Sequence, residues 1–177
     1  MKQFGTMSAF YTSDNQDYIL PNNVDSSTLW FMLFKPYFGR VAGSMTVQQL
    51  SVFLICPSDT APGTNIWWAG LSGSYCYSYE MGNGNGLITF PAYKQYKFKK
   101  TSFFKDPVAV GQMSEMDATA KGWAYWPWYL SDFSAEQFIN FLHQGSANVL
   151  HLGGNVKGYK IGDMITNSNN LTANYCQ

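Results

Sequence analysis

Apolar and polar positions alternate, or form short apolar runs, over much of the chain. Residues 40–47 alternate, and residues 50–56 (Leu-Ser-Val-Phe-Leu-Ile-Cys) are nearly continuously apolar up to a proline. A run of this length that ends at proline is typical of a strand buried on both faces. We therefore expect a core strand here, with Leu50, Val52 and Leu54 buried.

Further strands are expected along the chain, because apolar and aromatic runs recur every roughly ten residues, the spacing of a sandwich or barrel. Gly- and Asn-rich turns separate them, and the run Gly82-Asn83-Gly84-Asn85-Gly86 has the composition of a hairpin loop. The expected strands are 7–12, 66–71, 74–80, 87–91, 93–100, 108–112, 149–152 and 156–166.

Two short helices are expected between the strands. One covers 26–34, where Asp and Ser residues precede apolar residues at helical spacing, and Leu33 faces the core. The other covers 135–143, because Ser134 and Gln137 have the spacing of a capping box and a glycine lies just past the end. We place Phe141 of this helix in the core.

The composition points to a protein that works through its surfaces. Hydrophobic residues make up 46% of the chain, aromatic residues 18% and charged residues only 12%, with eleven basic and eleven acidic residues. A neutral surface does little to repel a second copy, so a covered surface in an assembly is favoured over a free enzyme. We expect one domain over 1–177, with an N-terminal arm at 1–24 and a flexible tail at 167–177.

The cysteines are Cys56, Cys76 and Cys176, an odd number without a CxxC pair. Their spacing fits neither a disulfide framework nor a zinc site, so free thiols are expected, although one bridge stays open. The sequence contains no secretory signal pattern and no apolar run of membrane-spanning length. The glycosylation triplet Asn170-Leu171-Thr172 is interpreted as unused.

Candidate catalytic groups are few, since His143 and His151 are the only histidines. A triad of Ser146, His143 and Asp132 or Asp163 can be written, but no serine lies in a nucleophile-elbow pattern. A cysteine–histidine dyad through the penultimate cysteine is weaker still. Two histidines eight residues apart match no metal-site spacing. We expect no catalytic residue, no metal and no cofactor.

Two clusters are candidates for binding. Lysines gather where alternation places them on one strand face, as an edge-protecting surface or as a contact for RNA or another anion. An aromatic segment is too rich in rings to bury all of them on one strand, which indicates a subunit interface or a sugar platform, unless the segment turns and buries its rings. The clusters are Lys94, Lys97, Lys99, Lys100 and Lys105, and Trp123, Tyr125, Trp126, Trp128 and Tyr129.

Three segments, read in order, carry a resemblance. A short helix with Trp30 runs into the segment 37–45 (Tyr-Phe-Gly-Arg-Val-Ala-Gly-Ser-Met), the segment 88–93 reads Ile-Thr-Phe-Pro-Ala-Tyr, and 158–163 reads Gly-Tyr-Lys-Ile-Gly-Asp. This order resembles the jelly-roll capsid proteins of picorna-like viruses, the group with picornaviruses, dicistroviruses and iflaviruses. Gln177 also suits cleavage of a viral polyprotein. Val41-Ala42 departs from the family's direct Arg-Gly-Ser.

The resemblance implies an all-β fold, a jelly-roll antiparallel β-sandwich with two short helices. It implies a structural, non-enzymatic capsid subunit of an icosahedral shell, located in the virion and, during assembly, in the host cytoplasm. Its partners would be other capsid subunits, with genomic RNA at the inner face and a host receptor or glycan outside. The alternative is a β-sandwich carbohydrate- or receptor-binding module, such as a capsid protruding domain.

Overall fold

The structure is a computed structural model of the chain. It describes residues 1–22, 24, 28–39, 45–65, 71–78, 99–115 and 139–166.

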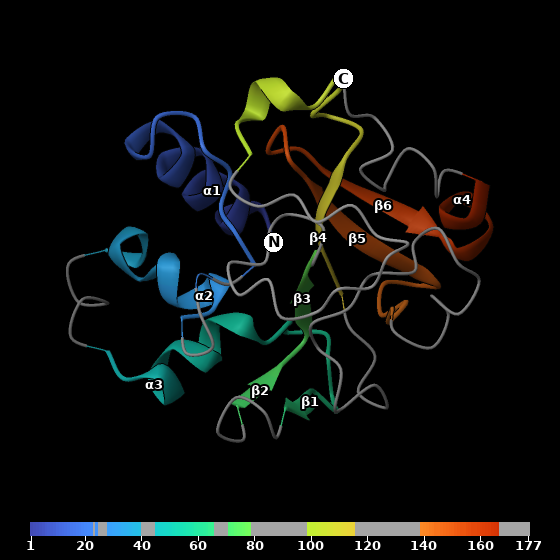
Figure 1. The fold of residues 1–177 in the computed structure, drawn as a ribbon. Coiled ribbons are helices and arrows are strands. Elements are labelled where there is room, and N and C mark those ends of the chain that lie inside the picture. The colour runs from blue at the N-terminus through green and yellow to red at the C-terminus, as the bar shows by residue number, and fades with distance from the viewer. Residues whose placement is uncertain are drawn as a thin grey trace, which may run out of the picture.

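A four-stranded antiparallel sheet with the order β3-β4-β5-β6 lies at the centre (Figure 1). A separate pair of strands, β1 and β2, lies beside helix α3. β4 and β5 pair with an irregularity between Gly111 and Met113, and β5 and β6 form a regular hairpin. The strands are β1 (Gly63–Asn65), β2 (Leu71–Gly73), β3 (Tyr75–Tyr77), β4 (Gly111–Glu115), β5 (Ser146–His151) and β6 (Val156–Lys160).

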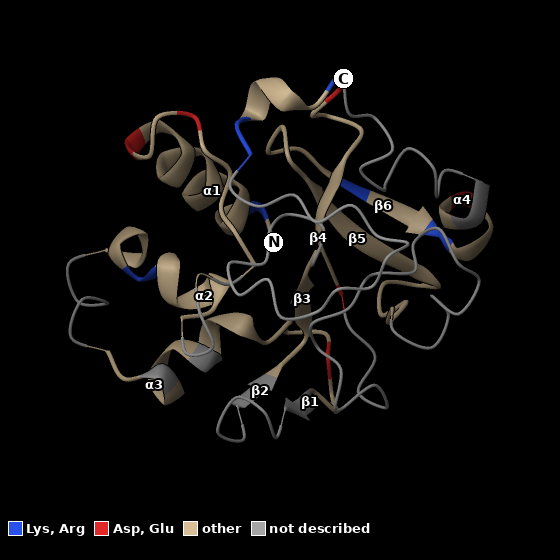
Figure 2. Cartoon of the chain, viewed as in Figure 1, with Lys and Arg blue, Asp and Glu red and all other residues tan. Residues whose placement is uncertain are grey.

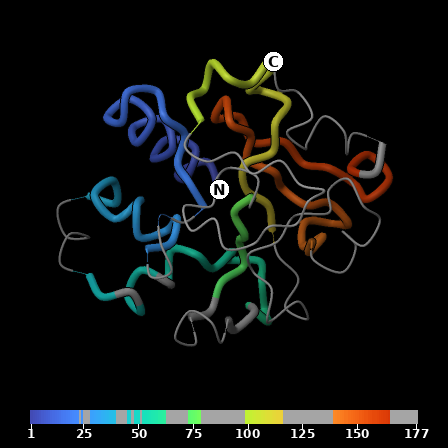
Figure 3. Tube along the Cα trace, viewed as in Figure 1, coloured from blue at the N-terminus to red at the C-terminus, as the bar shows by residue number. Residues whose placement is uncertain are grey.

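The helices divide around this sheet. The N-terminal helices α1, α2 and α3 lie on one side, whereas α4 lies at the far edge beside β6, as the colour order along the chain shows (Figure 3). The α-helices are α1 (Lys2–Asp14), α2 (Trp30–Leu33), α3 (Val47–Ser51) and α4 (Ile161–Thr166), and single 3-10 turns are η1 (Lys35–Phe38), η3 (Val52–Leu54) and η6 (Thr101–Phe103).

Helix α1 packs on the chain's own sheet. Its buried residues include Phe4, Met7 and Ser8, which share a face because they are three and four positions apart. A Cβ on Gly5 would lie 2.8 Å from the Gly154 carbonyl oxygen, so only glycine allows the helix to approach the β5–β6 hairpin this closely. The expected N-terminal arm therefore contains a docked helix.

A neutral hydrogen-bond network fixes α1 to the sheet. Gln112 Nε2 donates to Ser8 Oγ and to the Tyr77 hydroxyl, each at 2.8 Å. The Tyr77 hydroxyl donates in turn to the Leu20 carbonyl at 2.6 Å. Burial raises the pKa of Tyr77, so this hydroxyl keeps the proton that it donates. We call Ser8, Gln112 and Tyr77 the neutral network.

Apolar side chains cover both faces of the sheet. Along β5, Ala147 and Val149 face a small cluster with Tyr159 and Met164, whereas Leu150 faces the large cluster under α1 and α2. Trp30 is fully buried in the large cluster and stacks on Tyr77 with ring centroids 5.5 Å apart. Helices thus cover the face that a second sheet would cover in a sandwich.

The expected jelly-roll, all-β sandwich is therefore wrong, since the described residues form one four-stranded antiparallel sheet with several helices. The clearest error is the segment 50–56, which starts in α3 and continues in η3. Thr46 and Gln49 form a capping box that starts this helix. Leu50 and Leu54 are buried as expected, but Val52 is 68% exposed.

Other expected elements also change type. Residues 7–12 are helical, 161–166 form α4, and the expected helix at 135–143 is wrong over its described part, where Ile139 lies in a β-bridge and 142–144 form a turn. The helix expected at 26–34 exists as the shorter α2, and Leu33 and Phe141 are only partly buried. The strands expected at 74–80, 108–112, 149–152 and 156–166 overlap β3, β4, β5 and β6. Residues 40–44, 66–70, 79–98 and 135–138 lie outside the described residues.

Candidate functional site

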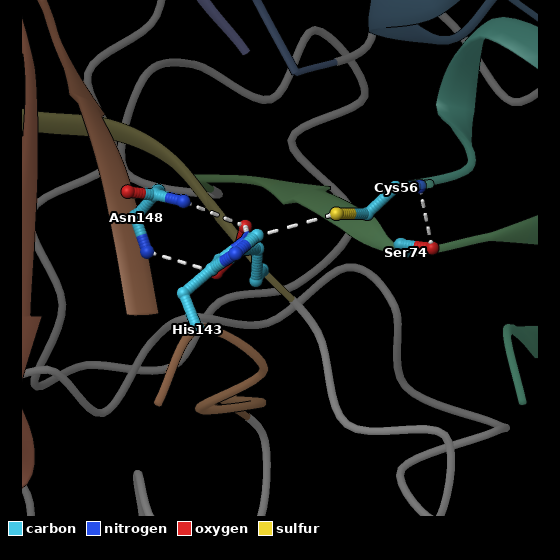
Figure 4. A network of polar contacts seen from close by, with 5 residues as sticks. Cys56, Ser74, His143 and Asn148 are labelled. Atoms are coloured by element: carbon cyan, nitrogen blue, oxygen red, sulfur yellow. Dashed lines mark hydrogen bonds and ion pairs between the residues drawn. The ribbon is translucent and has the colours of Figure 1, made fainter. Parts of the chain in front are cut away.

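Three side chains with donor atoms meet at the end of β4, and the close-up shows His143 facing Cys56 (Figure 4). His143 Nε2 lies 2.7 Å from Glu115 Oε1 and 3.6 Å from Cys56 Sγ. One donor atom from each residue lies within 4.8 Å of the other two. We call Cys56, Glu115 and His143 the donor cluster.

Glu115 is held in place by the neighbouring strand. It is 1% exposed, and its Oε2 accepts a hydrogen bond of 2.8 Å from the Asn148 backbone amide. Oε1 accepts a second bond of 3.1 Å from Asn148 Nδ2. The antiparallel register, which pairs Ser114 with Val149, brings Asn148 opposite Glu115. The carboxylate is thus oriented by β5 before any ligand arrives.

His143 is positioned by the tight turn that opens β5. Its backbone amide donates to the Ser146 carbonyl, and the Ser146 amide donates back to the His143 carbonyl, both at 3.0 Å. Gln144 and Gly145 between them have φ values of 54° and 77°, as in the type I′ turns of two-residue hairpins. The turn directs the imidazole to Glu115 and leaves the His143 side chain 35% exposed.

Cys56 follows η3 and is anchored through its backbone. Its amide donates to Ser74 Oγ at 2.9 Å, and the Ser74 amide donates to the Leu54 carbonyl at 2.7 Å. The residue is 3% exposed. Burial raises the pKa of Tyr75, and a hydrogen bond with the Cys56 side chain raises it further. The phenol of Tyr75 therefore lies beside the Cys56 thiol.

The positive group nearest in effect to the donor cluster is the amino group of Met1, which interacts electrostatically with Cys56 and Glu115. In the described part of the chain, the ion pair of Glu115 is with His143 and with no lysine or arginine. Figure 2 shows described lysines elsewhere, for example on β6 and in the segment before η6, whereas the end of β4 carries an acidic residue. A buried carboxylate is costly unless a cation or hydrogen bonds compensate it, and a cation would stabilise Glu115 beyond its two hydrogen bonds from Asn148. The candidates for that cation are the Met1 amino group and a metal ion.

The two contacts of His143 fall on the same ring nitrogen. In a nucleophilic triad, the base meets the nucleophile through one nitrogen and the orienting acid through the other. A metal site instead needs one donor atom from each residue, all facing one point. The bond from Glu115 fixes which ring edge faces Cys56. The arrangement therefore has the geometry of a ligand set and lacks that of a triad.

The binding clusters expected from the sequence lie elsewhere. The segment Trp123–Tyr129, Lys94 and Lys97 are outside the described residues. Lys99 Nζ lies 4.4 Å from the centre of the Phe103 ring, and Lys100 Nζ lies 5.1 Å from that of Tyr18. Lys105 is exposed. An interface at the aromatic segment and an anion contact at the lysines stay predictions.

The second histidine is separate from the donor cluster. His151 is 1% exposed, and its Nε2 lies 3.1 Å from the Tyr159 hydroxyl on β6. Sequence spacing had joined His143 with His151 and Ser146, whereas the fold joins it with residues 28 and 87 positions away. A usable signal was Glu115 itself, an acid at the end of a buried strand in a chain with only 12% charged residues.

The chain matches no protein-family model, no curated protein and no solved structure. No helix in the described ranges combines the length and the apolar character that a membrane crossing requires. The resemblance to capsid proteins stays untested, and the fold that it implied is not the fold described above.

Proposed function

We propose that the protein binds a divalent transition-metal ion, with zinc as the preferred ion, through Cys56 Sγ, Glu115 and His143 Nε2. The observation that carries the proposal is the convergence of three different donor atoms, with one imidazole nitrogen facing both the sulfur and the carboxylate. Thiolate, imidazole and carboxylate are the ligands that Zn²⁺ uses in proteins, and softer or harder ions suit this mixture less well.

The distances support this assignment for two of the three donors. Sulfur and nitrogen bound to one tetrahedral zinc ion are about 3.6 Å apart, given bonds of about 2.3 and 2.05 Å. The observed separation of Cys56 Sγ and His143 Nε2 is 3.6 Å. Nitrogen and oxygen would be about 3.3 Å apart. Since they are 2.7 Å apart here, the carboxylate has to withdraw by about 0.6 Å (3.3 − 2.7).

The metal would act on the fold as well as on the cluster. Cys56 follows η3, Glu115 ends β4, and His143 precedes β5, so one ion joins three segments that are remote in sequence. Ligand contacts of this kind stabilise the folded state, because the unfolded chain cannot offer all three donors at one point.

The alternative for the same residues is a cysteine nucleophile with His143 as base. The 3.6 Å contact between Cys56 and His143 agrees with it. However, Glu115 occupies the nitrogen that would have to take the thiol proton. A cysteine nucleophile explains the contact between Cys56 and His143, but it does not explain why His143 Nε2 contacts Glu115 as well. We therefore prefer the metal site.

The test is a zinc titration of the reduced, tag-free chain, followed by calorimetry and by metal analysis after gel filtration. We expect one ion per chain for the wild type, and loss of binding in Cys56→Ser, Glu115→Gln and His143→Gln. The matched controls are Cys76→Ser and His151→Gln, which alter the other described cysteine and the other histidine. Equal binding by Cys56→Ser and Cys76→Ser would refute the proposed site.

We also propose self-association as a second function, and an aromatic pair on α1 and η1 with one exposed ring favours it. Phe10 is 55% exposed and stacks on Tyr37, with ring centroids 6.4 Å apart and planes at 27°. The chain has a formal charge of zero and so does little to repel a second copy. This retains the assembly role expected from composition without the jelly-roll fold.

Sedimentation equilibrium tests this second function. We expect the wild type to associate and Phe10→Ser to shift toward the monomer. Val108→Ser is the matched control, because Val108 is similarly exposed, at 57%, but lies outside α1. A wild type that stays monomeric at every concentration would exclude self-association.

A further inference from the structure

The donor cluster supplies three ligands, whereas zinc takes four in most protein sites. Structural zinc sites are closed by four protein ligands, and catalytic sites keep three protein ligands and a water molecule. Which class applies here depends on whether the chain can supply a fourth donor. The following inference rests on the metal binding proposed above.

The described neighbours of the cluster are poor fourth ligands. Among the described residues, no further histidine, cysteine, aspartate or glutamate places a donor atom within the cluster. Asp59, three positions after Cys56, instead accepts a hydrogen bond of 3.0 Å from the Ala61 amide through Oδ1. Asn148 already donates both its backbone amide and its Nδ2 to Glu115.

Tyr75 and the Met1 amino group are further described groups near Cys56. The phenol of Tyr75 is not among the usual zinc ligands, which are thiolate, imidazole and carboxylate. Its ring is also fixed against Phe4, with centroids 5.6 Å apart. Tyr75 is therefore placed to donate a hydrogen bond toward the cluster rather than to coordinate the ion.

The three ligands differ in exposure, which gives the cluster one accessible side. Cys56 is 3% exposed and Glu115 is 1% exposed, whereas the His143 side chain is 35% exposed. The thiolate and the carboxylate together cancel the two positive charges of the ion. Such a neutral centre attracts anions less strongly than a metal ion whose ligands are all neutral, because that ion keeps its full positive charge.

We infer that the bound metal keeps one exchangeable position on the His143 side, which a water molecule fills and a small monodentate anion can replace. The site then belongs to the open class of metal centres, which can polarise a bound ligand. The ligand class is limited to small ions and single donor groups, since two of the three protein ligands are buried.

Cobalt substitution tests this inference in the full chain. Co²⁺ should give a thiolate-to-metal charge-transfer band in the wild type that Cys56→Ser lacks. Sodium azide is then titrated at constant ionic strength against sodium chloride. We expect a saturable shift of the visible cobalt bands at millimolar azide, with cobalt still bound to the chain after gel filtration.

Each other outcome has a distinct meaning. A charge-transfer band with no azide response would overturn the open position and leave metal binding intact. A response found in Tyr75→Phe but not in the wild type would overturn it too, because it would make Tyr75 the fourth ligand. Release of cobalt by azide would likewise contradict an exchangeable position. Absence of the charge-transfer band would refute the proposed metal site itself.

Discussion

The neutral network and the donor cluster both connect the sheet to segments around it, but they differ in chemistry. In the neutral network, Gln112 donates to Ser8 and Tyr77, and each group has a partner. In the donor cluster, two acidic groups and an imidazole crowd one point, with a single nitrogen between them. The first arrangement is complete by itself, whereas the second is best completed by a cation.

This difference separates a structural role from the proposed functional one within a single sheet. A closed chain of neutral hydrogen bonds stabilises the position of a helix and offers nothing to a ligand. A cluster of convergent donors at the end of β4 is destabilising unless it is neutralised. Gln112 and Glu115 are only three residues apart on this strand, so substitutions there can test both regions independently.

The largest effect is expected from breaking the neutral network. Gln112→Ala leaves the Ser8 hydroxyl without its partner and opens a cavity between α1 and the sheet. We expect the free energy of unfolding to fall by about 2–4 kcal/mol, with zinc affinity unchanged. Urea denaturation of the metal-free protein measures this loss, and exposed Gln3→Ala is the control. A loss below about 1 kcal/mol would show that the network contributes little.

Zinc should stabilise the donor cluster and not the neutral network. At a free zinc concentration of about 100 times Kd, ligand binding adds about 2.7 kcal/mol to the free energy of unfolding. We expect this gain in the wild type and in Cys76→Ser, and none in Cys56→Ser. Thermal or urea unfolding with and without zinc measures it. A gain of the same size in Cys56→Ser would place the zinc elsewhere.

Substitution of Asn148 tests how much its hydrogen bonds to the Glu115 carboxylate contribute to zinc binding. Asn148→Ala removes one of the two hydrogen bonds that Asn148 donates to Glu115. We expect zinc binding to weaken by about 10–100-fold, because partners of ligating carboxylates have effects of this size. Calorimetric titration measures the change, with Asn155→Ala on the same hairpin as control. Unchanged affinity would mean that the backbone amide alone holds Glu115.

The smallest effect concerns the histidine outside the cluster. Burial first, and then the nearby Lys157, lower the pKa of His151, while a backbone hydrogen bond and Asp106 oppose the shift. Well above about pH 6.5 neither state binds the proton, so this contribution is flat. As the pH falls below that value, the unfolded chain protonates first and stability is lost, by at most about 1.4 kcal/mol per pH unit.

His151→Gln should remove that slope. Urea unfolding of the two proteins at a series of pH values between about 7.5 and 5.5 gives the comparison. Identical pH profiles would show that His151 titrates alike in the folded and unfolded chains.

The strands of the central sheet were predicted from the sequence more successfully than the helices. β3, β4, β5 and β6 overlap expected strands, since aromatic and branched residues in these segments do favour strands. The segment 50–56 failed because a buried apolar run fits a strand and a helix equally well. Thr46 and Gln49 carried the deciding signal, the spacing of a capping box.

The prediction that Gly145 ends a helix was wrong. Gly145 after an apolar stretch fits a helix end, but its positive φ serves the hairpin turn that positions His143. The donor cluster could not be predicted from local spacing, since Cys56 and His143 are 87 positions apart and meet only through tertiary contacts. Local sequence patterns do not show which distant residues come into contact in the folded chain.

The central claim is that Cys56, Glu115 and His143 bind one metal ion together. X-ray absorption at the zinc edge tests it most directly, in a zinc-loaded Cys76→Ser, Cys176→Ser variant that keeps Cys56 as its one cysteine. The account predicts one sulfur at about 2.3 Å from zinc, with nitrogen and oxygen ligands at about 2.0–2.2 Å. A zinc shell without sulfur would contradict it.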